Sequence, residues 1–163
     1  MGRPYCTITL SLLALAAASC TKPTPAAATA EAAPEATPYN TGIDVDEVMV
    51  HAMDPSARQF WAGWGETYDD KGWHDVSAKT DEEWKKVEDG AAMVVLATNT
   101  LMLPAYQRKP EAEWNKWARQ VADIALRGKD AADKKDKAAM ETIGGELDVA
   151  CDKCHEAFRK VEK

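Results

Sequence analysis

Apolar residues recur at steps of three and four through most of the chain after about residue 44, and this spacing restricts the fold more than any other feature. Residues so spaced lie on one face of an α-helix, which has 3.6 residues per turn. The sequence contains four amphipathic stretches of this kind and no convincing strand. Four such helices with fairly short connections predict an all-α fold, an antiparallel four-helix bundle.

The first stretch has two methionines on its apolar face, Met49 and Met53, one helical turn apart. Asp54-Pro55 interrupts the stretch, and proline lacks the amide hydrogen that a helix interior needs. We therefore expect either a kink or a fresh helix start with Asp54 as the cap. The spacing extends this helix to Tyr68, and a loop is expected from Gly72 to Ala78. The apolar face comprises Met49, Met53, Ala57, Phe60, Trp61, Trp64 and Tyr68.

The second and third stretches have recognisable ends. Thr80-Asp-Glu-Glu83 is a capping box, in which the threonine hydroxyl and the glutamate side chain satisfy backbone amides of the first turn. This helix should end near Pro104. The third helix should begin around Pro110, with Gly128 as its terminator.

The fourth stretch is expected from about Ala131 to Lys160. It contains the pair Gly144-Gly145, and glycine weakens a helix interior. Two interpretations remain open. The pair is a local kink, or its missing side chains make room for a cofactor or a close neighbouring helix.

Residues 1–19 have the composition of a secretory signal. They contain one basic residue, Arg3, no acidic residue, and an apolar run from Ile8 to Ala18 that ends in small residues. A membrane-spanning helix needs about 20 apolar residues, so this run is too short to be one. The segment also contains Cys6.

Cys20 follows the small residues at the position where a bacterial lipoprotein carries its acylated cysteine, although Ala17 stands where such signals usually have leucine. We expect a lipid anchor at Cys20; the alternative is a soluble periplasmic protein cut by the general signal peptidase. Residues 20–43 are rich in proline and alanine, a composition typical of a flexible tether. Residues 44–163 form the folded domain.

The net charge of −7 argues against nucleic acid as a partner, because phosphate binding needs stripes of lysine and arginine. The charge identifies no partner by itself.

Cys151-Asp-Lys-Cys154-His155 is the most specific motif in the chain. In covalent haem attachment two thiols add across two vinyl groups, and the adjacent histidine reaches the iron. Positions 151, 154 and 155 project from one face of a helix, so this helix alone could hold one side of a porphyrin. A bare C-x-x-C could also be a redox disulfide or half of a zinc site. For zinc, the only other histidines are His51 and His74, at no recognisable spacing.

A bundle of four helices with this motif near the end of the last one resembles the class II c-type cytochromes, cytochrome c′ and its low-spin relatives such as cytochrome c-556. The terminal pattern Cys-x-x-Cys-His-x-x-Phe-Arg, here 151–159, carries the resemblance, which covers residues 44–163. It implies one haem c, attached through Cys151 and Cys154, with iron bound by His155. No methionine follows His155, which excludes the class I arrangement.

In the family that this chain resembles, the residue facing the iron opposite the histidine comes from the first helix. A methionine there makes the iron six-coordinate and suited to electron transfer, whereas a bulky apolar residue leaves it five-coordinate and able to bind small gases. The resemblance favours Met49 as the axial ligand, with Met53 as the alternative. Both could instead be core residues, as most methionines are. His51 is on the opposite face, typical of a surface histidine.

Arg159 lies one turn beyond His155 and is a candidate to pair with a haem propionate, because guanidinium and carboxylate match in bidentate fashion. The alternative is a solvated terminal arginine.

Together these features predict a periplasmic cytochrome that transfers single electrons between redox proteins, rather than an enzyme. It would be held at a bacterial membrane by a lipid on Cys20. The alternative function is a five-coordinate cytochrome c′ that binds nitric oxide or another small gas. Family members often pair through their first two helices, so the resemblance also raises a homodimer.

Overall fold

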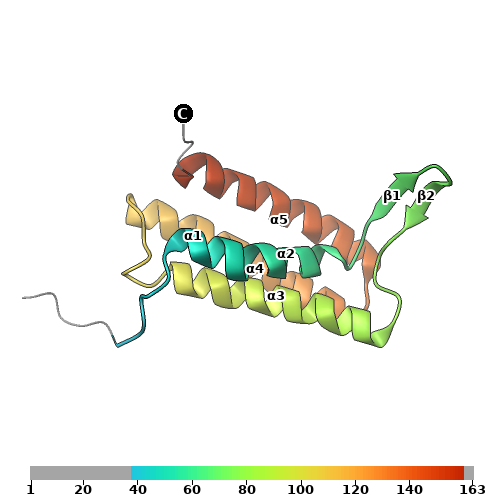
Figure 1. Cartoon of the computed structure of the whole chain (residues 1–163), viewed down its shortest axis with the longest axis horizontal. Coiled ribbons are helices and arrows are strands. Elements are labelled where there is room, and N and C mark those ends of the chain that lie inside the picture. Colours follow the sequence, from blue (N-terminus) through green and yellow to red (C-terminus); the bar gives the residue numbers. More distant parts are fainter. Residues whose placement is uncertain (1–37, 160–163) are drawn as a thin grey trace, which may run out of the picture. The chain divides into compact units, whose positions relative to one another are not determined.

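The computed structural model describes residues 38–159, and these are mostly helical. The prediction of a mainly helical chain is confirmed, and the described part contains four helical segments and a small two-stranded sheet. The first segment joins α1, a π-helical turn and α2 without a break (Figure 1). The elements are α1 Val45–Val48, the π-helical turn Met49–Met53, α2 Asp54–Trp61, β1 Glu66–Asp69, β2 Gly72–Asp75, α3 Asp81–Leu101, α4 Glu111–Asp133 and α5 Lys137–Phe158.

The first helical segment begins at a capping box that the sequence analysis missed. Asp44 accepts from the backbone N–H of Glu47 at 2.9 Å, and the Glu47 carboxylate accepts from the N–H of Asp44 at 3.0 Å. Of the two alternatives at Asp54-Pro55, the fresh start with Asp54 as the cap is wrong, because Asp54 has helical dihedral angles and its N–H bonds back to the carbonyl of Met49. A π-helical turn instead precedes Pro55, which has no N–H to continue the regular hydrogen-bond ladder.

A β-hairpin replaces the expected end of the first helix and the expected loop. Strand β1 pairs antiparallel with β2, so that Glu66 lies opposite Asp75 and Asp69 opposite Gly72. Tyr68 therefore belongs to a strand, and 68% of it is exposed. Gly65 at φ 144° and Gly72 at φ 108° adopt dihedral angles that other residues rarely reach, and these turns let the chain leave the helix and reverse.

Helix α3 begins as predicted at the Thr80 capping box, with Thr80 accepting from the N–H of Glu83 at 3.2 Å. Helix α4 begins after Pro110 but runs through Gly128, so Gly128 is not its terminator. A Cβ atom at Gly128 would lie 2.5 Å from Cζ of the buried Phe60 ring. The glycine thus makes room on α4 for the ring of Phe60 from α2.

Helix α5 begins at Lys137, six residues later than expected, because Lys135 at φ 54° ends the preceding turn and Asp136 caps the new helix. The helix is continuous through Gly144-Gly145, so the pair is not a break. A Cβ at Gly144 would lie 2.7 Å from Cε2 of Trp64, which means that the missing side chain leaves space for this indole.

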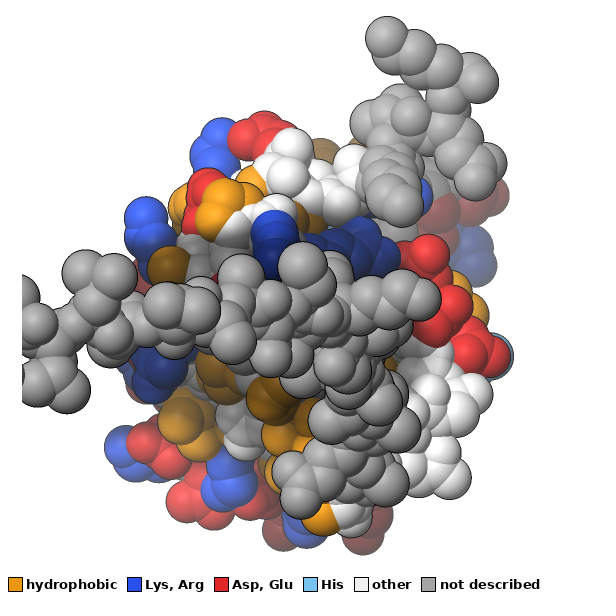
Figure 2. Space-filling view, turned by 90° about the vertical axis from the view of Figure 1, so that its left-hand side faces the viewer, with side chains coloured by type: hydrophobic (Ala, Val, Ile, Leu, Met, Phe, Trp, Pro, Cys, Tyr) orange, Lys and Arg blue, Asp and Glu red, His pale blue; other side chains and the backbone are white. Residues whose placement is uncertain are grey.

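The core forms where α3 packs against α4, α4 against α5, and α2 against α3. Helix α5 has only a minor contact with α2, and within the described residues its backbone approach to α1 and the π-helical turn is sparse at most. In Figure 1 the ribbon of α5 accordingly diverges from that of α1 toward the C-terminal end. Charged side chains of both signs are interspersed on the face seen in Figure 2, with apolar side chains visible between them.

Candidate functional site

Five of the residues singled out in the sequence line one small cavity. Cys151, Cys154 and His155 reach it from α5, and Met49 and Met53 reach it from the π-helical turn. The cavity has a volume of about 40 Å³. The remaining lining residues come from α3 and α4: Thr98, Leu101, Trp114, Ala118 and Val121.

The local structure explains why these side chains meet. Positions 151, 154 and 155 are three and four residues apart, so regular helix geometry puts them on one face of α5. The two methionines stand at the first and last positions of the π-helical turn. π-Helical turns are rare in proteins, and those that do occur are often at functional sites.

The cavity wall is apolar even where polar residues contribute. The hydroxyl of Thr98 donates to the carbonyl of Val94 at 2.6 Å, and the indole N–H of Trp114 donates to the carbonyl of Leu101 at 2.6 Å. These bonds satisfy the polar atoms within the protein. Phe158 packs edge-on against Trp114, with ring centroids 5.1 Å apart.

The two thiols are free and partly buried. Burial raises the pKa of the Cys151 thiol to about 11, helped by the neighbouring Cys154 and the carboxylates of Asp148 and Asp152. Burial also raises the pKa of Cys154, and the positive charge of Arg108 acts in the opposite direction.

Arg108, in the connection between α3 and α4, is a residue beside the site that the sequence analysis missed. Its guanidinium donates to the carbonyl of Phe158 at 3.0 Å and to the carboxylate of Asp46 at 3.1 Å. No motif or periodicity marks this position, because both partners are distant in the sequence. Arg159, the residue that the motif suggested, is exposed, and its backbone N–H donates to the carbonyl of His155 at 2.8 Å.

The other candidate residues lie away from the cavity or outside the described part. His51 is exposed, and His74 lies on the hairpin beside Asp69 at 2.8 Å. Cys20, the signal and most of the tether fall in residues 1–37, outside the described residues. Gly144 faces Trp64, so the space above it holds an indole.

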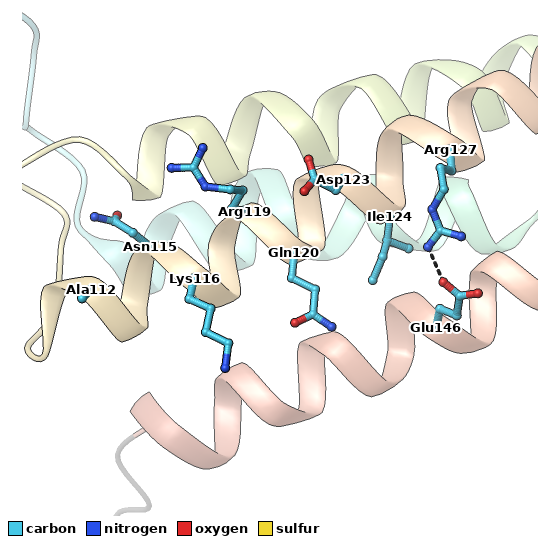
Figure 3. Close-up of a pocket in the computed structure, with 9 residues that line it drawn as sticks. All are labelled: Ala112, Asn115, Lys116, Arg119, Gln120, Asp123, Ile124, Arg127 and Glu146. Atoms are coloured by element: carbon cyan, nitrogen blue, oxygen red, sulfur yellow. Dashed lines mark hydrogen bonds and ion pairs between the residues drawn. The ribbon is translucent and has the colours of Figure 1, made fainter.

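A larger, open groove of about 620 Å³ lies between α4 and α5, and none of the residues predicted from the sequence lines it (Figure 3). Arg127 and Glu146 form an ion pair across it, linking the two helices. The lining is Ala112, Asn115, Lys116, Arg119, Gln120, Asp123, Ile124, Arg127 and Glu146.

Between residues 38 and 159, no three or more His, Cys, Asp or Glu side chains are grouped so that they could hold a bare metal ion. None of the helices in that range is long and apolar enough to cross a membrane. Comparisons with protein-family models, with curated proteins and with solved structures found no match to this chain.

Proposed function

We propose that this protein is a mono-haem c-type cytochrome that transfers single electrons. Cys151 and Cys154 would form the thioether links, and His155 would be one axial ligand of the iron. The observation that supports this most strongly is the convergence of both thiols, the imidazole and two thioethers on one apolar cavity. The donors come from two elements that are far apart in the sequence, Met49–Met53 and Lys137–Phe158, so their meeting is a tertiary feature that the motif alone does not require.

The residues present fit a haem in their chemistry. Two thiols three residues apart, an adjacent imidazole and an apolar surround are the groups that covalent haem attachment uses. The cavity, at about 40 Å³, is much smaller than a porphyrin. Haem binding would therefore require α5 to move away from α1 and the π-helical turn, with which α5 has few close backbone contacts.

The state of the thiols also bears on the alternatives. Reactive cysteines in redox C-x-x-C sites have lowered pKa values, since the thiolate is the nucleophile, and zinc likewise binds thiolates. Here burial raises the pKa of both Cys151 and Cys154. Their environment resembles that of inert buried thiols, which argues against a disulfide-exchange site.

A haem bound here would supply one-electron chemistry, and a methionine ligand would tend to raise its potential. His155 would hold the iron from α5. Met49 would complete the ligation from the π-helical turn, with Met53 as the alternative ligand. Both thioethers line the cavity, so the choice between them is a matter for experiment.

We further propose that the helical segments form an antiparallel four-helix bundle of the class II cytochrome type. A lipid on Cys20 would hold the domain at a bacterial membrane, facing the periplasm, where redox proteins would be its partners. Residues 20–43 would give the domain reach from that membrane.

Absorption spectra of the purified full chain, expressed with a haem-maturation system, test the proposal. A low-spin ferrous spectrum that carbon monoxide leaves unchanged is expected. Met49→Ala should open the sixth position and allow carbon monoxide to bind, whereas the matched control Met53→Ala should not. The reverse result would assign the ligand to Met53.

Two outcomes would contradict parts of the proposal. Ready binding of carbon monoxide by the unaltered protein would favour the gas-binding alternative, for which an apolar cavity lined by methionines is also suitable. A colourless protein with the mass of the bare polypeptide would refute the haem assignment altogether.

A further inference from the structure

Arg108 connects α5, which carries three of the candidate donors, to α1, the helix directly before the π-helical turn that carries the two methionines. Its Nη1 donates to the carbonyl of Phe158 at the end of α5, and its Nη2 donates to Asp46 on α1. The guanidinium carbon also lies 5.8 Å from the ring centroid of Trp114, a residue of the cavity wall. Arg108 is therefore at the edge of the cavity, and its charge acts on Cys154.

The Asp46 carboxylate is an exchangeable partner of this guanidinium. The Asp46 side chain is 83% exposed, and the Arg108 side chain is 30% exposed. Ion pairs with so exposed a member contribute little to stability, since water solvates the carboxylate almost as well. Arginine has five N–H donors in a planar fork, and Arg108 uses two of its nitrogens for Asp46 and Phe158. A carboxylate that arrived at the edge of the cavity could replace Asp46 at low cost.

Arg159 has a weaker structural case for the same role. It follows the last residue of α5 and is exposed, and its side chain forms no hydrogen bond or ion pair with any residue in the described range. Nothing orients its guanidinium toward the cavity. The Arg108 guanidinium is instead held by a backbone carbonyl and stacked near an indole.

We propose that Arg108 binds a carboxylate of the cofactor, a haem propionate, in the place that the Asp46 carboxylate occupies in this structure. This inference rests on the proposed function. Arg108 would act as a positioning residue, because it would touch the periphery of the cofactor and not the iron. Through its hydrogen bond to the carbonyl of Phe158, Arg108 would also keep the end of α5 attached to the connection between α3 and α4.

Resonance Raman spectroscopy of the haem-loaded full chain tests this directly, because the propionate bending band reports hydrogen bonding to the propionates. Arg108→Gln should shift this band to lower wavenumber. Arg108→Lys, which keeps the charge but loses the fork, should shift it partway. The matched control Arg159→Gln should leave the band where it is. A role of Arg108 in joining the helices alone would not move the band.

An unchanged propionate band in loaded Arg108→Gln protein would overturn the inference, and so would a shift caused by Arg159→Gln alone. If Arg108→Gln does not accumulate as loaded protein, Arg108→Lys decides, and an unshifted band in that variant is the contrary result. A wild-type chain that takes up no haem would refute the proposed function, and the inference with it. A coloured wild-type protein with insensitive variants would refute the inference only.

Discussion

The two adjacent glycines of α5 permit a sharp test of how this helix packs. A Cβ atom at Gly144 would lie 2.7 Å from Cε2 and 3.0 Å from Cζ2 of Trp64, whereas a Cβ at Gly145 would meet nothing within 4 Å. The indole of Trp64 is rigid and packs against the core, so it cannot simply bend aside. Alanine at position 144 should therefore strain the contact between α5 and Trp64 in the turn after α2.

The magnitudes follow from two opposing effects. Alanine is more favourable than glycine in a helix interior by about 0.8–1 kcal/mol, and both substitutions gain this. Overfilling a packed site costs about 1–3 kcal/mol, and only Gly144→Ala incurs this cost. Gly145→Ala should thus raise the free energy of unfolding by up to about 1 kcal/mol. Gly144→Ala should lie about 1–3 kcal/mol below Gly145→Ala, because the helix-propensity terms cancel between neighbours.

Urea unfolding of the two variants beside the wild type measures the difference. Denaturant slopes are about 1–3 kcal/mol per molar urea for small proteins, so the two midpoints should differ by on the order of 1 M. Replacing Trp64 with leucine should reduce the penalty of Gly144→Ala, because the two changes share one contact. If Gly144→Ala stabilised the protein as much as Gly145→Ala, Trp64 would not occupy the space above Gly144, and the packing argument would fail.

Three further predictions concern single side chains. Phe60→Ala removes a fully buried ring from the core and should lower the unfolding free energy by about 3–5 kcal/mol in the same assay. Thr80→Ala removes the cap of α3 and should cost about 1 kcal/mol, with Thr80→Ser as a control that retains the hydroxyl. Hydrogen bonds from Ser77, and then the Lys137 ammonium, hold the pKa of Asp75 well below its usual range. The stabilising effect of the Asp75 carboxylate should be complete above the ordinary carboxyl pKa of about 4 and be lost as pH falls further. Asp75→Asn should therefore flatten the acid side of the plot of unfolding free energy against pH. A slope like that of the wild type in this variant would contradict the prediction.

Local periodicity and end signals predicted most of the helical structure. The capping box at Thr80 and the start after Pro110 depend on residues close in sequence, and the structure confirms both. Gly128 is a residue type typical of helix ends, but here the absence of its side chain makes room for Phe60, a residue of another helix. The hairpin escaped prediction because its strands are only four residues long and Tyr68 continues the helical spacing of the preceding segment.

The candidate site divides in the same way. Cys151, Cys154 and His155 share a face because they share a helix, which spacing alone predicts. The two methionines satisfy the same rule, so spacing alone could not choose between them; the resemblance favours Met49, and the cavity is lined by both. Arg108 could not be found from the sequence, because its partners Asp46 and Phe158 are 62 and 50 residues away and belong to two other elements.

The packing of the described elements indicates which part of the domain would respond to a cofactor. Helices α3 and α4 pack extensively against each other and supply the wall of the cavity, with the polar atoms of Thr98 and Trp114 satisfied internally. Under the proposed function the iron ligands come instead from α5 and the π-helical turn, which approach each other sparsely at most. Arg108 links α5 to α1, the helix directly before the π-helical turn, by two hydrogen bonds, one of them to an exposed carboxylate. Opening the site between α5 and the π-helical turn would therefore break few close backbone contacts, and residues of these two elements that held a haem would join them through the cofactor.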